Sequence, residues 1–399
     1  MAKRLWWERA DLGYFNGRLQ FAGCDLNEIV AQAGMPTYVY SAGRVKANIG
    51  RLQQALTSHN VRHKLFYALK ANRFLPLVTS LRLSDLCGID VCSPGELLLA
   101  RQMGFAQGEI SYTGTSVSAA DLDVLQRHPL VHVNCDALST IRRLGECCPR
   151  RTIGIRINPE VGAGYNAELR YAGDKATKFG VYRDRFVEAL ELAAKYDLQV
   201  KQLHFHFGSG YRSEQLPQLA EALERANWFL AQCPEIETVD IGGGMGVPLV
   251  EGERPLDLDQ WAAVIAKFAH AQNVTVHLEP GDFLVKDAGV LLLQVNSVEE
   301  KGGTTFVGVN GGFNLQNLAT YYKTPFVPVP LLWNEDVPLE KVTIAGNINE
   351  AIDLLAEDVW LPRLVEGDYL ALLNVGGYGA ASSSNHCMRG QYAEYFLPL

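Results

Sequence analysis

The feature of this 399-residue sequence that most limits its fold is a regular alternation of short apolar strands and amphipathic helices. The β-type runs lie at 65–68, 88–91, 110–112, 131–133, 153–157, 202–206, 238–241 and 275–278. Helical patterns lie between them, at 94–103, 119–126, 185–196, 214–231 and 258–271. Strands that alternate with helices predict a parallel sheet. Eight of them predict an α/β fold, a (β/α)8 TIM barrel with its functional site at the carboxyl ends of the strands.

The pattern changes after Glu279-Pro280-Gly281, where β-type runs follow one another without long helices between them. These runs cover 289–298, 305–309, 342–345 and 369–373. At the other end of the chain, Asn16-Gly17 forms a hairpin signal that precedes a short helix ending near Gly34. Because both ends fall outside the barrel, we expect a barrel domain at 36–280. Residues 1–35 together with 281–399 would form a second, mainly β domain.

Charge and cysteine content exclude several classes of protein. The 36 basic and 44 acidic residues give a net charge of −8 without a basic run, which argues against a nucleic-acid partner. No apolar stretch has the length of a signal-peptide core or a membrane span, so we expect a cytoplasmic protein with no membrane partner. The 8 cysteines are too irregularly spaced for a disulfide framework or a zinc site. We therefore expect reduced thiols and no metal.

Reactive side chains and glycines close the expected barrel strands, where they would meet at one mouth. They are, in chain order, Lys70, Asp90, Arg156, His206, Ser209, Gly242 to Gly244 and Glu279. A lysine at the end of a buried strand is either an end-cap whose ammonium reaches solvent or a desolvated amine able to form a Schiff base. Taken alone, Lys70 favours the first interpretation, since lysine seldom stays buried.

Two glycine-rich turns and an acid favour the second interpretation. Backbone N–H groups of Gly242–Gly244 and of Gly208-Ser209-Gly210 can cradle an anion, although a glycine run alone is more often a tight turn. A phosphate cradle with a Schiff-base lysine predicts pyridoxal 5′-phosphate. Glu279, otherwise a plain ion-pair partner, would then keep the ring nitrogen protonated and strengthen the electron sink. His206 either stacks on that ring or is a core histidine bonded to a carbonyl.

Several of these segments resemble the fold-type III pyridoxal-phosphate decarboxylases, the ornithine/diaminopimelate decarboxylase group related to alanine racemase. The resembling segments are Tyr67–Asn72, Phe205–Gly210, Gly242–Gly244, Glu279–Gly281 and Gly377–Ala380. The resemblance spans nearly the whole chain and implies that Lys70 holds the cofactor and His206 stacks on its ring. It also implies that Tyr378, Ser209 and the Gly242–Gly244 loop bind the phosphate. From their places at the ends of barrel strands, we expect Asp90 and Arg156 to be further cofactor contacts. By resemblance the protein would be a homodimer in which the partner's β domain completes each site.

The chain departs from that family in the catalytic loop of the β domain. Where the family has a cysteine followed by an acid, this chain has Asn349-Glu350. An amide is too weak an acid to protonate the substrate Cα, so the proton would come from water, Lys70 or His206. Glu350 remains available to hold the substrate or to donate a proton.

The residues expected to face the substrate also depart from the family. Diaminopimelate decarboxylases carry arginines where this chain has Asp282 and Leu318, and ornithine-type enzymes carry aspartate where Lys323 follows Tyr322. An anion in place of a cation would repel a distal carboxylate. We therefore expect a substituted diamino acid, such as a citryl-diamino acid of siderophore biosynthesis.

Three alternatives remain. The first is decarboxylation of diaminopimelate or another basic amino acid. The second is an amino-acid racemase, which Glu279 disfavours because racemases of this fold place arginine at the ring nitrogen. The third is an inactive decarboxylase-like partner protein, which the intact Lys70 and phosphate turns disfavour.

Overall fold

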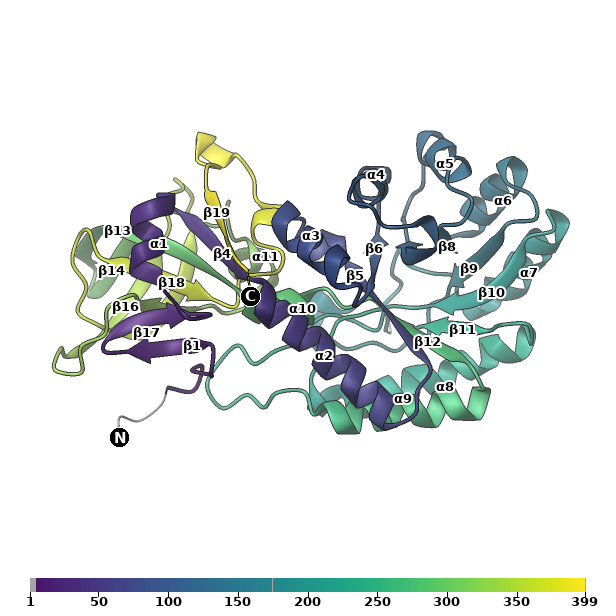
Figure 1. Ribbon diagram of the computed structural model, residues 1–399, viewed down its shortest axis with the longest axis horizontal. Helices are drawn as coiled ribbons and strands as arrows, with labels where there is room; N and C mark the ends of the chain where they lie inside the picture. Colours follow the sequence, from purple (N-terminus) through teal and green to yellow (C-terminus); the bar gives the residue numbers. More distant parts are fainter. Residues whose placement is uncertain (1–4, 174, 399) are drawn as a thin grey trace.

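The computed structural model describes residues 5–173 and 175–398, and it places a barrel beside a β-rich domain along the long axis (Figure 1). Residues 1–4, part of the expected N-terminal segment, lie outside the described residues. No helix among those described is both long and apolar enough to cross a membrane.

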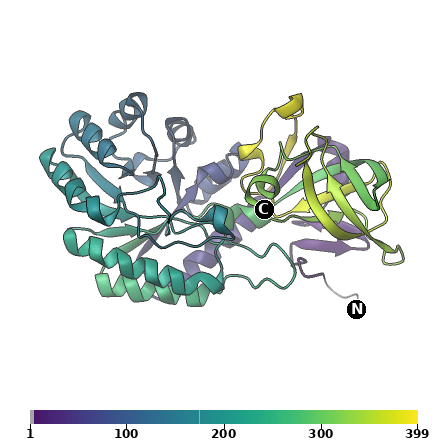
Figure 2. The same ribbon diagram turned by 180° about the vertical axis from the view of Figure 1, so that it is seen from behind.

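Eight parallel strands close into a barrel in the order β10-β11-β12-β5-β6-β7-β8-β9, as the sequence predicts. Their bounds are β5 His63–Ala68, β6 Gly88–Val91, β7 Ile110–Tyr112, β8 His132–Cys135, β9 Thr152–Arg156, β10 Gln199–His204, β11 Thr238–Asp240 and β12 Thr275–Leu278. The helices lie outside the strands in both views (Figures 1 and 2). They are α2 Ala42–Ser58, α3 Leu75–Ser84, α4 Pro94–Gln102, α5 Ala119–Gln126, α6 Leu138–Cys147, α7 Phe186–Lys195, α8 Leu216–Gln232 and α9 Leu258–Gln272.

Local sequence explains where these helices begin and which face they bury. In α4 the Ser93 hydroxyl accepts the Glu96 N–H at 3.3 Å, and Pro94 occupies the first turn, where its missing N–H costs nothing. In α2 the residues Val45, Ile49, Leu52 and Leu56 are all fully buried. Their spacing of three and four residues places them on the helix face that packs on the barrel.

The second domain is built on a sheet with the strand order β15-β18-β13-β14-β16-β17. The bounds are β13 Gly289–Lys301, β14 Thr304–Val309, β15 Val327–Pro330, β16 Leu339–Ala345, β17 Leu354–Pro362, β18 Tyr369–Leu373 and β19 Ala393–Leu397. The N-terminal elements are β1 Leu12–Phe15, β2 Arg18–Phe21, β3 Cys24–Asp25 and α1 Leu26–Ala33. Their buried Leu19 and Phe21 share one core cluster with Leu292 and Ala371 of the sheet.

The strand β4 (Thr37–Ser41) lies in this second sheet, although it falls within the barrel domain expected at 36–280. It pairs antiparallel with β13 and parallel with β19. Because the backbone hydrogen bonds of β4 go to these two strands, the barrel segment begins at Ala42 and not at residue 36.

Candidate active site

A cavity of about 350 Å³ opens at the carboxyl ends of the barrel strands. Most of the residues selected from the sequence line it together, namely Lys70, Arg156, His206, Ser209, Gly244, Glu279, Asp282 and Tyr378. Other lining residues, among them Thr113, Tyr171 and His204, had no role assigned from the sequence. The strand ends therefore bring an amine, an imidazole, a glycine turn and a carboxylate to one place.

Lys70 lies in a one-turn helix, η1 (Leu69–Ala71), that follows β5, and its Nζ donates to Asp90 Oδ2 at 3.1 Å. The Lys70 side chain is 43% exposed, at the edge of the cavity. Partial burial opposes the charge on this amine, but Asp90, Tyr378 and Glu279 together raise the pKa of Lys70 above its usual value. Burial raises the pKa of Asp90 to about 7; Glu279 adds to this shift and Lys70 opposes it. Asp90 Oδ1 is buried and has no partner among the described residues.

The Lys70 turn is also attached to the second domain. Tyr378 donates its N–H to the Ala71 carbonyl at 2.8 Å, and the Asn72 side chain donates to the Gly376 carbonyl at 2.8 Å. These bonds hold Tyr378 at the cavity wall, so both domains of one chain form the site.

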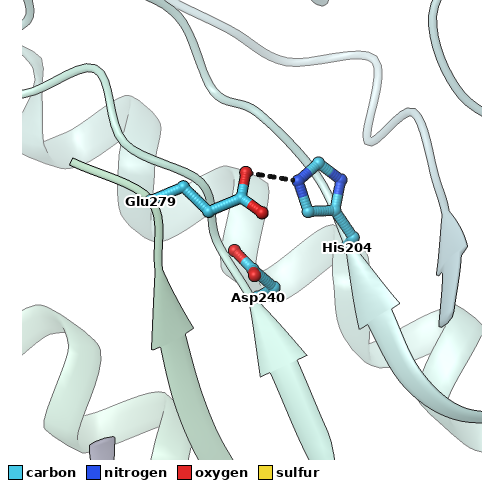
Figure 3. A group of neighbouring side chains, drawn as sticks. All are labelled: His204, Asp240 and Glu279. Carbon is cyan, nitrogen blue, oxygen red and sulfur yellow. Dashed lines mark hydrogen bonds and ion pairs between the residues drawn. The ribbon is translucent and has the colours of Figure 1, made fainter. Parts of the chain in front are cut away.

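Glu279 follows β12 and is held by two donors from other barrel strands, His204 of β10 and Ser111 of β7. His204 Nε2 lies 3.0 Å from Oε2 (Figure 3). The Ser111 hydroxyl donates to Oε1 at 2.9 Å. Burial favours the neutral acid, but His204, Lys70 and Ser111 together lower the pKa of Glu279 below its usual range. Burial and the Glu279 carboxylate raise the pKa of Asp240 well above its usual value. Asp240 therefore keeps the proton and Glu279 the negative charge.

Ligand atoms of His204, Asp240 and Glu279 all lie within 4.8 Å of one another, which is also a spacing that a metal ion would allow. The hydrogen bond between His204 and Glu279 explains this grouping without an ion (Figure 3). We therefore interpret His204 and Asp240 as side chains that support a charged Glu279.

Two glycine turns interlock beside this group. The Gly210 and Tyr211 N–H groups both donate to the Gly244 carbonyl, at 2.7 and 3.1 Å. Gly244 has φ +89°, and a Cβ built on it would lie 1.6 Å from the Gly208 carbonyl oxygen. A Cβ on Gly243 would lie 2.2 Å from the Glu279 carbonyl oxygen. Only glycine permits this close approach, which leaves bare backbone facing the cavity.

His206 closes the cavity on the side of these turns. Its Nε2 lies 3.4 Å from the Ser209 hydroxyl, and its ring meets Tyr171 edge-on with centroids 4.7 Å apart. Burial, with the positive charges of Lys70 and Arg156 nearby, lowers the pKa of His206 to about 3. A neutral imidazole suits contact with an aromatic ring, but it argues against His206 as the source of a proton.

Arg156 is fixed by its surroundings. Its Nη1 lies 3.3 Å from Asp136 Oδ1, and its guanidinium lies over the Phe179 ring at 4.5 Å. It lines the cavity as expected, but its charge is already paired.

A second cavity, of about 210 Å³, adjoins the first and shares Lys70, Tyr171, Ser209, Asp282 and Tyr378 with it. Leu318 and Tyr322 from α11 (Leu318–Tyr322) line this space, and their contact with a substrate stays a prediction. Lys323 is exposed and lines neither cavity. The structure therefore does not bring Lys323 to the substrate side of the site.

Asn349 and Glu350 are exposed and line neither cavity of their own chain. Glu350 Oε1 lies 3.4 Å from His386 Nε2, and both side chains are about half exposed. The site of a single chain therefore does not include Asn349 or Glu350.

These residues fit pyridoxal 5′-phosphate. An amine beside a carboxylate can hold an aldehyde carbon, a charged Glu279 can face a ring nitrogen, and bare glycine backbone can hold a phosphate. The fit depends on supporting residues that sequence reasoning missed, above all Ser111 and His204. His204 had a detectable signal, because it is the last residue of β10 and precedes His206 by only two residues.

The description of the matching family model is pyridoxal-dependent decarboxylase, pyridoxal binding domain, and the match covers residues 42–286. The chain is 34% identical to a diaminopimelate decarboxylase of Methanothermobacter thermautotrophicus, over 96% of this chain and 91% of the relative. It is 28% identical to a diaminopimelate decarboxylase of Escherichia coli K12, over 92% and 89%.

Solved structures show the same likeness. A diaminopimelate decarboxylase from M. jannaschii in complex with L-lysine has a TM-score of 0.89 and 25% identity, covering 98% of this chain and 93% of that one. An arginine decarboxylase of Paramecium bursaria Chlorella virus has a TM-score of 0.83 and 23% identity, covering 93% and 99%, which shows the fold alone.

Proposed function

The chain belongs to the pyridoxal-dependent decarboxylases, and from this membership we propose that it removes the α-carboxylate of an amino acid that carries a polar group at its far end. The observation that carries the proposal is the placement of Lys70 and Glu279 in one cavity, with a second cavity extending from Lys70. When bound, pyridoxal 5′-phosphate supplies an electron sink for the charge left at Cα as carbon dioxide departs.

The protein's own residues have separate tasks in this reaction. Lys70 binds the cofactor covalently, and Asp90 beside it accepts a hydrogen bond from the free amine. Glu279 stays anionic because His204 and Ser111 donate to it, and it holds a proton on the ring nitrogen. The glycine turns and Tyr378 hold the phosphate. His206 packs against the ring as a neutral imidazole.

The proton that returns to Cα needs a donor within reach. Lys70 lies at the junction of the two cavities, so it is within reach of Cα. Its raised pKa favours the protonated form of the free amine, which therefore has a proton to donate. The amide of Asn349 cannot donate this proton. We propose a homodimer in which Asn349 and Glu350 of a second copy face the substrate, since neither reaches the cavity of its own chain.

The sequence left two kinds of substrate open, a citryl-diamino acid and diaminopimelate. The similarity to enzymes named diaminopimelate decarboxylase gives no support to a citryl-diamino acid, whereas it agrees with the alternative, diaminopimelate. The hydrogen bond from His204, which keeps Glu279 charged, disfavours a racemase. The intact pair of Lys70 and Asp90 disfavours an inactive decarboxylase-like partner protein.

The test is carbon dioxide release by purified protein loaded with pyridoxal 5′-phosphate and offered meso-diaminopimelate, lysine, ornithine, arginine and a citryl-diamino acid. We expect absorbance near ~420 nm from the lysine-bound cofactor and turnover of at least one of these amino acids. Loaded protein that releases carbon dioxide from none of them would refute the proposal.

A further inference from the structure

A chain of hydrogen-bonded polar side chains crosses the interior of the barrel and ends at Glu279. The Gln202 amide donates to Asn134 Oδ1 at 2.8 Å, and Asn134 Nδ2 donates to the Ser111 hydroxyl at 3.3 Å. Ser111 in turn donates to Glu279 Oε1 at 2.9 Å. The four residues come from β10, β8, β7 and the end of β12, and none is more than 8% exposed. The sequence analysis identified only the last of them.

The row of residues across β8, β9 and β10 explains why the two amides meet. Gly154 of β9 is in register with Asn134 on one side and with Gln202 on the other. A Cβ built on Gly154 would lie 2.2 Å from Asn134 Oδ1. The missing side chain on the middle strand therefore leaves the space in which the amides of the two flanking strands bond to each other.

The direction of the chain follows from the charge at its end. A carboxylate can only accept, so the Ser111 hydroxyl gives its one hydrogen to Glu279 and accepts from Asn134. Asn134 therefore turns its amino group toward Ser111, which leaves its Oδ1 to accept from Gln202. All three donors point toward Glu279. Hydrogen bonds aligned in this way polarise one another and favour the negative charge at the end of the chain.

The chain lies between two cavities. Gln202 and Asn134 line a further cavity, of about 350 Å³, at the amino ends of the barrel strands. At the other end of the chain, Glu279 lines the cofactor cavity, which Ser111, Asn134 and Gln202 do not reach. Asn134 also donates to the Thr113 hydroxyl at 2.9 Å, a side branch that Ser111 does not share. An effect of Ser111 on a bound cofactor must therefore pass through Glu279.

We propose that Ser111, Asn134 and Gln202 are positioning residues that act through Glu279 on the ring nitrogen of the bound cofactor. They hold the Glu279 carboxylate in one orientation and keep it charged, so that it can retain a proton on that nitrogen. This role rests on the proposed function, in which Glu279 faces the ring nitrogen. The interior of the barrel thereby contributes to the cofactor site without touching the cofactor.

The test compares the Kd of the apoprotein for pyridoxal 5′-phosphate with its Kd for the 1-deaza analogue, in which a CH group replaces the ring nitrogen. The ratio of the two values isolates the contact at that nitrogen, because the other contacts are common to both ligands. We expect the wild type to prefer pyridoxal 5′-phosphate by ~10²-fold, since a CH group cannot form the charged hydrogen bond. Ser111→Ala should lower this preference ~10-fold. Asn134→Leu should lower it ~3-fold, because Asn134 acts one bond further away, and Gln202→Leu should lower it least.

A second variant perturbs the chain without removing any of its members. In Gly154→Ala the new Cβ displaces the Asn134 amide, and the preference should fall as much as it does in Asn134→Leu. If Asn134→Leu does not fold, Ser111→Ala still decides, because it removes a single hydroxyl.

Asn48 of α2 provides a matched control. Its side chain is fully buried, and its amide donates to the Leu284 carbonyl at 3.1 Å and to Asp287 Oδ1 at 2.7 Å. None of these three residues lines the cofactor cavity or the 210 Å³ cavity. Asn48→Leu should therefore lower the free energy of unfolding in denaturant but leave the preference for pyridoxal 5′-phosphate unchanged.

Glu279→Gln separates a failure of this role from a failure of the proposed function. A glutamine cannot retain the proton on the ring nitrogen, so this variant should lose the preference for pyridoxal 5′-phosphate. If it keeps the preference, Glu279 does not face the ring nitrogen, and both proposals are wrong. If Glu279→Gln loses the preference while Ser111→Ala and Asn134→Leu keep it, only the positioning role is wrong. An equal rise of both Kd values in the last two variants has the same meaning, since a merely structural chain would give that result.

Discussion

Replacing Gly244 by alanine tests whether the interlocked glycine turns hold the cofactor. The backbone of Gly244 has φ +89°, and the new Cβ would lie 1.6 Å from the Gly208 carbonyl oxygen. The oxygen belongs to the backbone, and the backbone also fixes the position of the Cβ. A side-chain rotation can therefore not relieve the clash. We expect the substitution to push the Gly208-Ser209-Gly210 turn away from the Gly242–Gly244 loop.

Gly252 provides a control with nearly the same backbone angle. Its φ is +87°, and a Cβ there would meet no atom within 4 Å. Alanine in the left-handed region costs about 1–2 kcal/mol, so Gly252→Ala should lower the free energy of unfolding by that amount. Overpacking adds a further ~1–3 kcal/mol at Gly244, which gives about 2–5 kcal/mol in total.

The assay is denaturant unfolding of both variants together with titration of the apoprotein with pyridoxal 5′-phosphate. Gly252→Ala should bind the cofactor as the wild type does. Gly244→Ala should raise the Kd at least ~10-fold, which corresponds to about 1.4 kcal/mol. If the two variants lost the same stability and bound the cofactor equally well, the steric argument and the phosphate role of this loop would both be wrong.

Three other predictions concern single side chains. Lys70→Ala should abolish the absorbance near ~420 nm and reduce turnover at least ~10³-fold, whereas Lys323→Ala, outside both cavities, should do neither. Burial, aided by His132 and Lys64 and opposed by Glu279, lowers the pKa of His277 to about 3. As the pH falls, His277 therefore takes up a proton in the unfolded chain before it does so in the folded one. The free energy of unfolding should fall by up to ~1.4 kcal/mol per pH unit from pH ~6.5 toward ~3. In denaturant unfolding, His277→Phe should lose less of this free energy than the wild type between pH 7 and pH 5. Asn349→Cys should lower turnover in a carbon dioxide assay if Asn349 of a second copy contacts the substrate, and a higher turnover would contradict that placement.

The barrel and most of its catalytic strand ends were predictable because each depends on a local pattern. Five expected segments match observed elements residue for residue, namely β6, β7, β12, β18 and α5. Lys70, His206 and Glu279 each follow such a strand, and the closure of the barrel brings them together. The helices α3 and α6 were missed, and α3 (Leu75–Ser84) has only Leu77, Val78 and Leu81 buried, which is a weak periodic signal.

The remainder of the site depends on contacts between distant residues. Ser111 sits within an apolar strand, and only the curvature of the barrel turns its hydroxyl toward Glu279, 168 residues further along the chain. From the sequence alone, Lys286 is typical of an exposed lysine on a helix. Its burial beside a cavity follows from the packing of the second domain. The membership of β4 in the second sheet has the same cause, since its partners come from β13 and from the end of the chain.

The pairing of β4 with β19 has a consequence for biosynthesis. Thr37 is in register with Ala393, so the strand that leads into the barrel finds one of its partners only after residues 393–397 have been synthesised. Until then, β4 presents an unpaired edge to other chains, as does any product truncated before residue 393. Deletion of residues 393–397 should therefore favour aggregation far more than an equal deletion from an exposed loop.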